Sequence, residues 1–345
     1  MTERTVSDTV ILPGGNAQTR AEKGIDLVAE IKRLRKEKNA VILAHYYQDF
    51  EIQDIADYVG DSLDLSRRAV ETDADVIVFC GVRFMSEVAK IVNPGRVVLL
   101  PDADAGCSLE QDCPPDEFRR WRADHPDHIS LTYINCSADV KALSDIIVTS
   151  SNAESIIRQL PEDQPILFAP DRHLGGYLNK KTGRDMVLWP GSCIVHEEFS
   201  EERILQLKAE YPDARVAAHP ECPDAILQLA DLVGSTKGIL DFVAKDPGET
   251  FIIATEPHII HQMEKDHPEK TFIPAPGVSE AREEGACPCT HCPYMAMNNM
   301  EKLYLSLVNM APRVEMPEDL RQEALKPLQR MLDMSPKQAA PQAAE

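Results

Sequence analysis

The sequence predicts an α/β protein of three pseudo-symmetric αβα domains, each with a small parallel sheet, arranged around a central active site. The first observation is length, because 345 residues are too many for one simple core, whereas units of about 85 to 90 residues have an ordinary domain size. The second observation is the apolar pattern. Short runs rich in Val, Ile and Phe alternate with helical stretches, which is typical of parallel strands covered by helices.

The third observation is an internal repeat of strand, polar tip, serine turn and further strands. His45, Tyr133 and His219 mark the opening strands at intervals of 88 and 86 residues. The turn serines recur at intervals of 88 and 85 residues, and a proline at the last strand recurs at 89 and 84. These landmarks are Ser62, Ser150 and Ser235, and Pro101, Pro190 and Pro274. Such regular spacing in three copies indicates a threefold repeat.

Each copy contains three segments that we expect to form strands. In chain order they are 41–47, 76–79 and 97–101, then 131–135, 166–168 and 187–190, then 216–221, 251–253 and 272–274. Helices are expected between the strands, as at 62–70 and 138–143. Residues 21–38 carry apolar side chains at helical spacing, which predicts a helix against the first copy, and 300–310 shows the same pattern.

The composition excludes several classes of function. The net charge of -21 opposes binding to nucleic acid, which depends on releasing counterions from phosphates. No apolar run approaches the roughly 20 residues needed to cross a bilayer, and the first 20 residues lack the apolar centre of a secretory signal. We therefore expect a cytoplasmic protein. Nine cysteines in a chain of this size predict reduced thiols or metal thiolates rather than a disulfide framework.

Polar side chains stand at the ends of the three opening strands. They are His45, Tyr47, Tyr133, Asn135, His219 and Glu221. Ligands of open parallel sheets bind beyond the carboxyl ends of the strands, so these residues are candidates for proton transfer and carboxylate binding. One such residue alone is more often structural, and one serine in a turn is usually a helix cap. Their recurrence in all three copies favours a site that binds phosphate or carboxylate.

Three cysteines close the three copies in equivalent places. Cys107, Cys193 and Cys292 would converge in a pseudo-threefold arrangement. Three thiolates suit an iron–sulfur cluster that has three protein ligands and one open iron, which can act as a Lewis acid. A cysteine alone is more often a small buried hydrophobe. That description suits Cys80, Cys113, Cys136 and Cys222.

Zinc is the competing interpretation. Cys287, Cys289, His291 and Cys292 place four zinc ligands within six residues, but the spacing is poor for a closed zinc site. Cys289 and Cys292 also have the spacing of a redox pair, although they follow a Gly and Pro loop rather than a strand of a βαβ unit.

Nine short segments, in order, resemble those of the quinolinate synthase family between about residues 41 and 308. The segments are His45-Tyr-Tyr-Gln48, Gly60-Asp-Ser-Leu-Asp-Leu-Ser66, Gly106-Cys-Ser-Leu109, Tyr133-Ile-Asn-Cys136, Thr149-Ser-Ser-Asn-Ala153, Gly191-Ser-Cys193, His219-Pro-Glu-Cys222, Gly234-Ser-Thr-Lys-Gly238 and Cys292-Pro-Tyr-Met-Ala-Met-Asn298. One such string is modest support, but nine in order are highly specific.

This resemblance implies an activity and a cofactor. Family members condense iminoaspartate with dihydroxyacetone phosphate, which gives quinolinate, phosphate and water for NAD biosynthesis. They do so with an oxygen-sensitive 4Fe-4S cluster among three αβα domains. The resemblance also implies a functional link to an aspartate oxidase that supplies iminoaspartate. Two alternatives from other classes stay open at this stage: a zinc-dependent hydrolase or lyase, and an iron–sulfur redox sensor.

The resemblance also assigns residues to roles. The cluster ligands are Cys107, Cys193 and Cys292. The substrate-binding residues are His45, Ser62, Tyr133, Ile134, Asn135, Ser150, His196, His219, Pro220, Glu221, Ser235 and Thr236. We expect Tyr47, His219 and Glu221 to transfer protons, because the reaction requires tautomerisation, isomerisation and loss of phosphate and water.

Domain boundaries follow from the repeat. We expect an N-terminal helix and the first αβα repeat in 1–110, the second repeat in 111–198, and the third in 199–290. The remainder, 291–345, would hold the last cysteine ligand, helices that pack back, and a disordered tail from 334. One departure from the family pattern is the C-x-C-x-x-C around Cys292, where some members have C-x-x-C-x-x-C. A regulatory disulfide between Cys287 and Cys289 would close a very tight ring and is not expected here.

Overall fold

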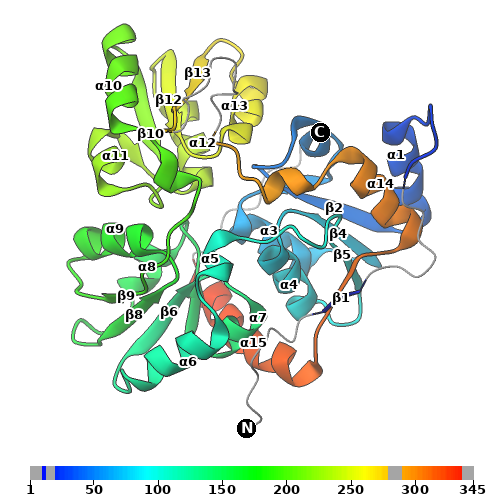
Figure 1. The fold of residues 1–345 in the computed structure, drawn as a ribbon, viewed down its shortest axis with the longest axis horizontal. Coiled ribbons are helices and arrows are strands. Elements are labelled where there is room, and N and C mark those ends of the chain that lie inside the picture. The colour runs from blue at the N-terminus through cyan, green and yellow to red at the C-terminus, as the bar shows by residue number, and fades with distance from the viewer. Residues whose placement is uncertain (1–9, 13–19, 279–289, 336–345) are drawn as a thin grey trace.

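The computed structural model describes residues 10–12, 20–278 and 290–335. Three small sheets alternate with helices along the chain, so the predicted α/β class is confirmed. Figure 1 shows three units of sheet and helices grouped around a common centre, with the first at the right, the second at the lower left and the third at the upper left.

The first sheet contains four parallel strands in the order β3-β2-β4-β5. It is extended by β14, which pairs antiparallel with β5, and by β1, which pairs antiparallel with β14. The strands are β2 (Ala40–His45), β3 (Tyr58–Gly60), β4 (Val76–Cys80), β5 (Val97–Leu99), β14 (Arg313–Glu315) and β1 (Val10–Leu12). The helices of this unit are α1 (Leu27–Glu37), α2 (Phe50–Ile55), α3 (Ser62–Glu71) and α4 (Arg83–Val92). Every residue of β4 is buried, as expected for a parallel strand that helices cover on both faces.

The second and third sheets each contain four parallel strands. The second comprises β6 (Ile129–Tyr133), β7 (Ile146–Val148), β8 (Ile166–Ala169) and β9 (Val187–Leu188), with helices α5 (Ser108–Gln111), α6 (Pro115–Ala123), α7 (Ala138–Ala142), α8 (Ala153–Ile157) and α9 (Arg172–Thr182). The third comprises β10 (Arg215–Ala218), β11 (Leu232–Val233), β12 (Thr250–Ala254) and β13 (Thr271–Pro274), with helices α10 (Glu201–Glu210), α11 (Asp224–Leu229), α12 (Thr236–Lys245) and α13 (Ile260–Asp266). The 3-10 turns are η1 (His196–Glu198), η2 (Pro257–Ile259) and η4 (Met295–Met297).

The three units share one strand order. In each, the opening strand lies between a short edge strand and the third strand, as β3-β2-β4-β5, β7-β6-β8-β9 and β11-β10-β12-β13. The repeat seen in the sequence therefore corresponds to three units with the same order of parallel strands. The short edge strands β3, β7 and β11 were not predicted from the sequence. They have two or three residues each and precede the serine turns.

The helices predicted near the two ends of the chain are present and pack together. Helix α1 begins at Leu27, later than the predicted 21, because the Asp26 side chain accepts the Ala29 N–H at 3.1 Å and caps the helix. Helix α14 (Met300–Asn309) ends where Met310 adopts a left-handed φ of 52°. Buried residues of both helices join β2 and β4 in one apolar cluster, so the predicted contact with the first unit is confirmed.

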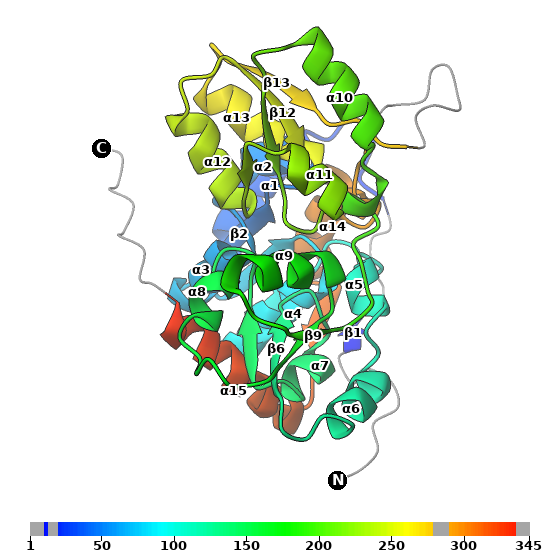
Figure 2. The same ribbon diagram turned by 90° about the vertical axis from the view of Figure 1, so that its left-hand side faces the viewer.

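The C-terminal helix α15 (Glu318–Met334) joins the first two units. It contacts α7, β7 and α4, and Figure 2 shows it at the base of the second unit. Its residues Leu328 and Met331 belong to a large apolar cluster that includes buried residues of both the first and the second units. Met334 ends this helix and Ser335 is buried, so ordered structure extends beyond residue 334. The rest of the predicted tail lies outside the described residues.

The third unit has apolar clusters of its own on the two faces of its sheet. Apart from Tyr46 and Tyr47, which pack against one cluster, their residues come from the third unit itself. None of the helices in the described part of the chain combines the length and the apolar character needed to cross a lipid bilayer.

Met331→Ala is expected to destabilise the contact between α15 and the first two units. Met331 is fully buried, and truncation of such a side chain costs about 2–5 kcal/mol of unfolding free energy. The measurement is the midpoint of urea unfolding by circular dichroism. The control is Leu205→Ala, which truncates a side chain on α10 that is 48% exposed and should shift the midpoint little. Equal shifts in both variants would contradict the packing described for α15.

Candidate active site

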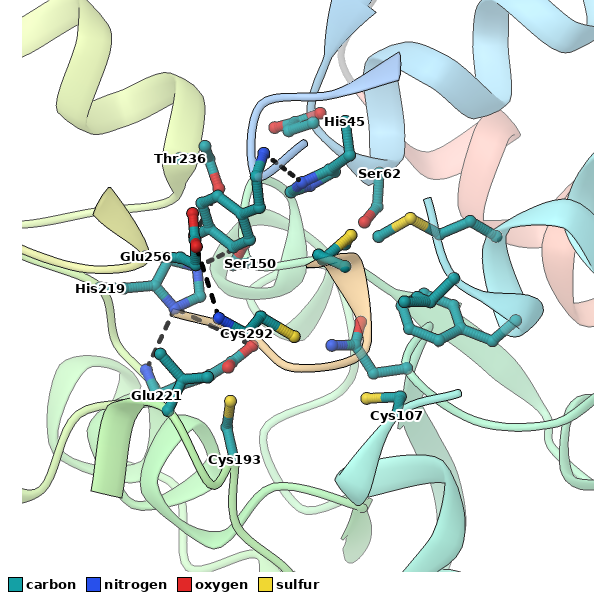
Figure 3. Close-up of a pocket in the computed structure, with 18 of the residues that line it drawn as sticks. His45, Ser62, Cys107, Ser150, Cys193, His219, Glu221, Thr236, Glu256 and Cys292 are labelled. Carbon is teal, nitrogen blue, oxygen red and sulfur yellow. Dashed lines mark hydrogen bonds and ion pairs between the residues drawn. The ribbon is translucent and has the colours of Figure 1, made fainter. Parts of the chain in front are cut away.

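A pocket with about 650 Å³ of empty space, part of it open to solvent, lies where the three units meet. Its wall includes thirteen of the residues that the sequence singled out. They are His45, Tyr47, Ser62, Cys107, Tyr133, Asn135, Ser150, Cys193, His196, His219, Glu221, Thr236 and Cys292. Figure 3 shows the labelled members of this set pointing into one space from several elements.

Parallel strands bring these residues together. Strand β2 ends at His45 and β6 ends at Tyr133, while His219 directly follows β10. The carboxyl ends of the three opening strands therefore meet at the pocket, as the rule for open parallel sheets predicts. Residues two positions further on, such as Asn135 and Glu221, extend from the same ends into the wall.

Three predicted substrate-binding residues are not part of the pocket wall. Ile134 is buried in the large apolar cluster, and Pro220 is buried beside His219. Ser235 caps helix α12 and accepts the Gly238 N–H at 3.1 Å. Each of the three directly adjoins a wall residue in the sequence. Neighbouring side chains point in different directions, so the sequence alone does not show which of them faces the pocket. A contact between substrate and any of the three stays a prediction.

The serine turns differ in what they offer an anion. Helix α3 begins at Ser62, but the Asp61 carboxylate accepts the N–H groups of Leu63 and Asp64 at 3.0 and 2.9 Å. A negative charge already occupies that helix N-terminus. Helix α12 instead begins at Thr236, and its cap is a neutral serine hydroxyl. Of these two helices, α12 is the better one for a phosphate or carboxylate.

A buried carboxylate organises one side of the pocket. Glu221 is 3% exposed; its Oε1 accepts the Tyr133 hydroxyl at 2.6 Å, and its Oε2 lies 2.9 Å from His196 Nδ1. Burial acts to raise the pKa of Glu221, but His196, His219 and the Tyr133 hydroxyl outweigh burial and hold this pKa below its ordinary value. Burial and the neighbouring Glu221 raise the pKa of Tyr133 well above its ordinary value. The pair is therefore a carboxylate and a neutral phenol.

A chain of contacts joins the two tyrosines of the pocket. Tyr47 Oη lies 2.6 Å from Thr255 Oγ1, and Thr255 Oγ1 lies 2.9 Å from His196 Nε2. The other nitrogen of His196 meets Glu221, which accepts from Tyr133. Burial raises the pKa of Tyr47 well above its ordinary value. An unbroken path of exchangeable protons therefore runs from Tyr47 to Glu221.

Two further histidines are held in the neutral form. Burial lowers the pKa of His219 to about 3 and that of His45 to about 4, although nearby carboxylates oppose this effect. His219 Nδ1 accepts the Glu221 N–H at 3.4 Å, so its Nε2–H donates to Ser150 Oγ at 3.3 Å. His45 Nδ1 accepts the Tyr47 N–H at 3.2 Å. Both rings can therefore donate or accept a proton without carrying a standing charge.

The three cysteines share one local structure. Each backbone carbonyl accepts the N–H four residues later, at Gln111, Glu197 and Ala296, so each cysteine begins a helical turn. Each sulfur also accepts a backbone N–H from the residue three positions later, at Glu110, His196 and Met295. Figure 3 shows the three side chains directed toward the same part of the pocket.

The three cysteines do not fit a single metal ion that all of them would bind. Burial raises the pKa of all three thiols, that of Cys292 to about 11, while the N–H···S bonds oppose this effect. A bound cation would therefore be needed to hold them as thiolates. Sulfurs around one zinc lie within about 4.6 Å, twice the Zn–S bond of roughly 2.3 Å. The groups of described donor atoms that lie within 4.8 Å of one another are Cys193-His196-Glu221 and Glu256-His258-His291, neither of which contains all three cysteines.

Four polar residues near the pocket were missed by the sequence interpretation. Asp61, Thr149 and Glu256 belong to the wall, and Thr255 links Tyr47 to His196. Thr255 and Glu256 directly follow strand β12, so they also stand at the carboxyl end of a parallel strand. The rule applied to the opening strands would have found them had it been extended to the third strand of each copy. Cys287 and Cys289, of the zinc interpretation, lie outside the described residues.

Fold and site together define a class: a three-unit α/β protein whose central pocket combines three equivalent cysteines with buried acid–base side chains. Residues 29–333 match the family model described as Quinolinate synthetase A protein. The chain is 60% identical to a quinolinate synthase from Thermosynechococcus vestitus over 311 aligned residues. The alignment covers 90% of this chain and 96% of the relative. A quinolinate synthase from Microcystis aeruginosa is 58% identical over 310 residues, 90% of this chain and 95% of the relative. The chain therefore belongs to the quinolinate synthetase A family.

Acidification is expected to destabilise the fold through His45. In the unfolded chain this histidine takes up a proton below its ordinary pKa of about 6.5, whereas the folded chain keeps it neutral down to about pH 4. The unfolded state therefore binds more protons in this window, and stability falls as pH is lowered through it, on the order of 3 kcal/mol in all. His45→Gln should flatten this part of the dependence, as measured by urea unfolding between pH 7 and pH 4. Equal slopes in the two proteins would contradict the assignment.

Proposed function

We propose that this protein is a quinolinate synthase that condenses iminoaspartate with dihydroxyacetone phosphate to give quinolinate, phosphate and water in NAD biosynthesis. We further propose a 4Fe-4S cluster held by Cys107, Cys193 and Cys292, and a place in the cytoplasm. The observation that carries the proposal is the convergence of three equivalent cysteine turns on the same pocket as the polar strand ends. Membership of the family supports the substrates, and an aspartate oxidase is the expected source of iminoaspartate.

When bound, the cluster would supply an open iron that polarises an oxygen of the substrate as a Lewis acid. The surrounding residues bind and orient the reactants. Thr236, at the start of α12, offers a hydroxyl and helix amides to the phosphate or to a carboxylate. Ser62 and Ser150 add hydroxyls from the other two units.

The pocket also contains buried polar atoms that a ligand could satisfy. Asn135 Oδ1 and Thr149 Oγ1 are buried, and neither atom has a hydrogen-bond partner among the described residues. Both residues line the pocket. Buried polar atoms are usually paired, so a ligand that donates from nitrogen or hydroxyl would satisfy them. An imine or enamine nitrogen and the hydroxyls of a triose phosphate are donors of this kind.

Proton transfer is assigned to the path between the two tyrosines. Tyr47 and Tyr133 are neutral and can donate, while Glu221 is ionised and can accept. A proton that Glu221 takes from the substrate can pass through His196 and Thr255 to Tyr47, and Tyr47 can return a proton to the substrate. His219 adds a neutral imidazole beside Ser150. Tautomerisation and loss of water both require such paired acceptors and donors.

The first test is quinolinate formation by anaerobically reconstituted protein supplied with dihydroxyacetone phosphate and freshly generated iminoaspartate. We expect product together with iron and acid-labile sulfide near four each per chain. Cys193→Ser should lose both the cluster and the product, because a ligand is removed. Cys80→Ser, which alters a fully buried cysteine at the end of β4, is the control and should keep both. A normal cluster in Cys193→Ser would refute the ligand assignment, and zinc without sulfide would favour the hydrolase alternative.

A second test addresses Glu221. Glu221→Gln keeps the shape of the side chain but cannot take up a proton, so kcat should fall by about 100-fold or more while the cluster spectrum is unchanged. The matched control is Glu197→Gln, which removes a nearby carboxylate that pairs with Arg172 outside the pocket and should leave kcat within about twofold. A kcat for Glu221→Gln close to that of the natural chain would exclude Glu221 as the proton acceptor.

A further inference from the structure

Glu256, His258 and His291 form a second group of close donor atoms beside the pocket. Glu256 Oε1 lies 2.8 Å from His258 Nδ1 and 3.3 Å from His291 Nδ1. The two imidazole rings lie against each other, with centroids 4.6 Å apart. One atom from each residue lies within 4.8 Å of the other two. The three residues come from the end of β12, the turn η2 and the segment before η4, so the fold gathers them from positions up to 35 residues apart.

The described residues place no permanent cation beside the Glu256 carboxylate. The Glu256 carboxylate is 1% exposed, and the ion-pair partners that it has among the described residues are these two histidines, with no lysine or arginine. The Asp49 carboxylate lies near enough to act on His258 as a further negative charge. A buried carboxylate without a permanent cation is costly, and a metal ion would neutralise it.

We propose that Glu256, His258 and His291 bind one zinc ion or a similar divalent first-row metal. Two imidazole nitrogens and one carboxylate oxygen are an established ligand set for zinc, with the fourth position left to water. Zinc bonds of about 2.0–2.1 Å place tetrahedral donors roughly 3.4 Å apart. The observed separations of 2.8 and 3.3 Å from Glu256 Oε1 are close to this value, and the two imidazole donor atoms lie within 4.8 Å of each other.

The proposed ion would fix the segment that carries the last cysteine. His291 directly precedes Cys292, and Glu256 Oε1 also accepts the Cys292 N–H at 3.4 Å. Metal bound at these three residues would clip that segment to strand β12 and turn η2 of the third unit. Because Glu256 also lines the pocket, the ion would act on the site without taking part in the reaction. This inference does not depend on the proposed activity.

The experiment is anaerobic equilibrium dialysis of the cluster-loaded protein against Zn²⁺, with zinc per chain determined by elemental analysis. We expect one zinc per chain with a Kd below about 10 µM. His258→Ala and His291→Ala should each weaken binding at least tenfold, because each removes a ligand, and the double variant should lose the ion. Circular dichroism establishes that the variants remain folded.

The matched control is His261→Ala. His261 stacks on Phe50, the ring that also contacts His258, and has a carboxylate partner in Asp54, but it is not one of the three donors. Binding should be unchanged in this variant. Zinc binding that is equal in the natural chain and in the double variant would overturn the proposal. Loss of the ion in Cys289→Ser, with the ion retained in the histidine variants, would overturn it as well.

A second background separates this site from the pocket. Cys193, His196 and Glu221 also lie within 4.8 Å of one another and could take zinc in protein that holds no cluster. If no cluster assembles, the dialysis is repeated on a Cys193→Ser background. One zinc that remains there and is lost with His258 and His291 supports the proposed site, whatever the outcome for quinolinate formation. Loss of all zinc in Cys193→Ser assigns the metal to the pocket and overturns the proposal.

Discussion

The hydrogen bond between Tyr133 and Glu221 joins the second and third sheets at the pocket, and much of the site depends on it. An ionised carboxylate that is almost fully buried must be compensated by hydrogen bonds and nearby charge, because an isolated one would cost several kcal/mol. Glu221 meets this requirement with Tyr133 and His196, and through His196 it reaches Thr255 and Tyr47. Satisfying one buried charge therefore sets the positions of residues from all three units.

The cysteine turns show how a repeated fold produces a repeated ligand. In each unit the cysteine lies beyond the last strand and begins a short helical turn, and its sulfur accepts an N–H from that turn. The helical turn orients the sulfur. The N–H groups at the start of the turn place a partial positive charge next to the sulfur, and this charge favours the thiolate form once a metal is present. Three copies of one backbone conformation thus supply three equivalent donors, Cys107, Cys193 and Cys292.

Much of the fold could be predicted because the repeat is visible as spacing, and the apolar runs have the length of buried strands. The antiparallel pairing of β1 with β14 could not be predicted, since it joins residues some 300 positions apart. The site followed the same division. The ends of the opening strands were found by rule, whereas Glu256 was missed because the rule was not applied to β12. The partner of each side chain, such as Tyr133 for Glu221, is a matter of three-dimensional packing, and the sequence alone could not supply it.

The two apolar clusters of the third unit consist of residues from that unit, apart from Tyr46 and Tyr47 of the first unit, which pack against one of them. The contacts of the third unit with the second unit at the pocket include the hydrogen bonds from Tyr133 to Glu221 and from His219 to Ser150. Separating this unit from the second would exchange these bonds for bonds to water, at a net cost of about 0.5–1.5 kcal/mol for the neutral His219–Ser150 bond and about 1.5–3 kcal/mol for the bond to the Glu221 carboxylate. It would not pull a shared core apart. The same polar contacts that order the reacting groups therefore also hold the third unit against the second.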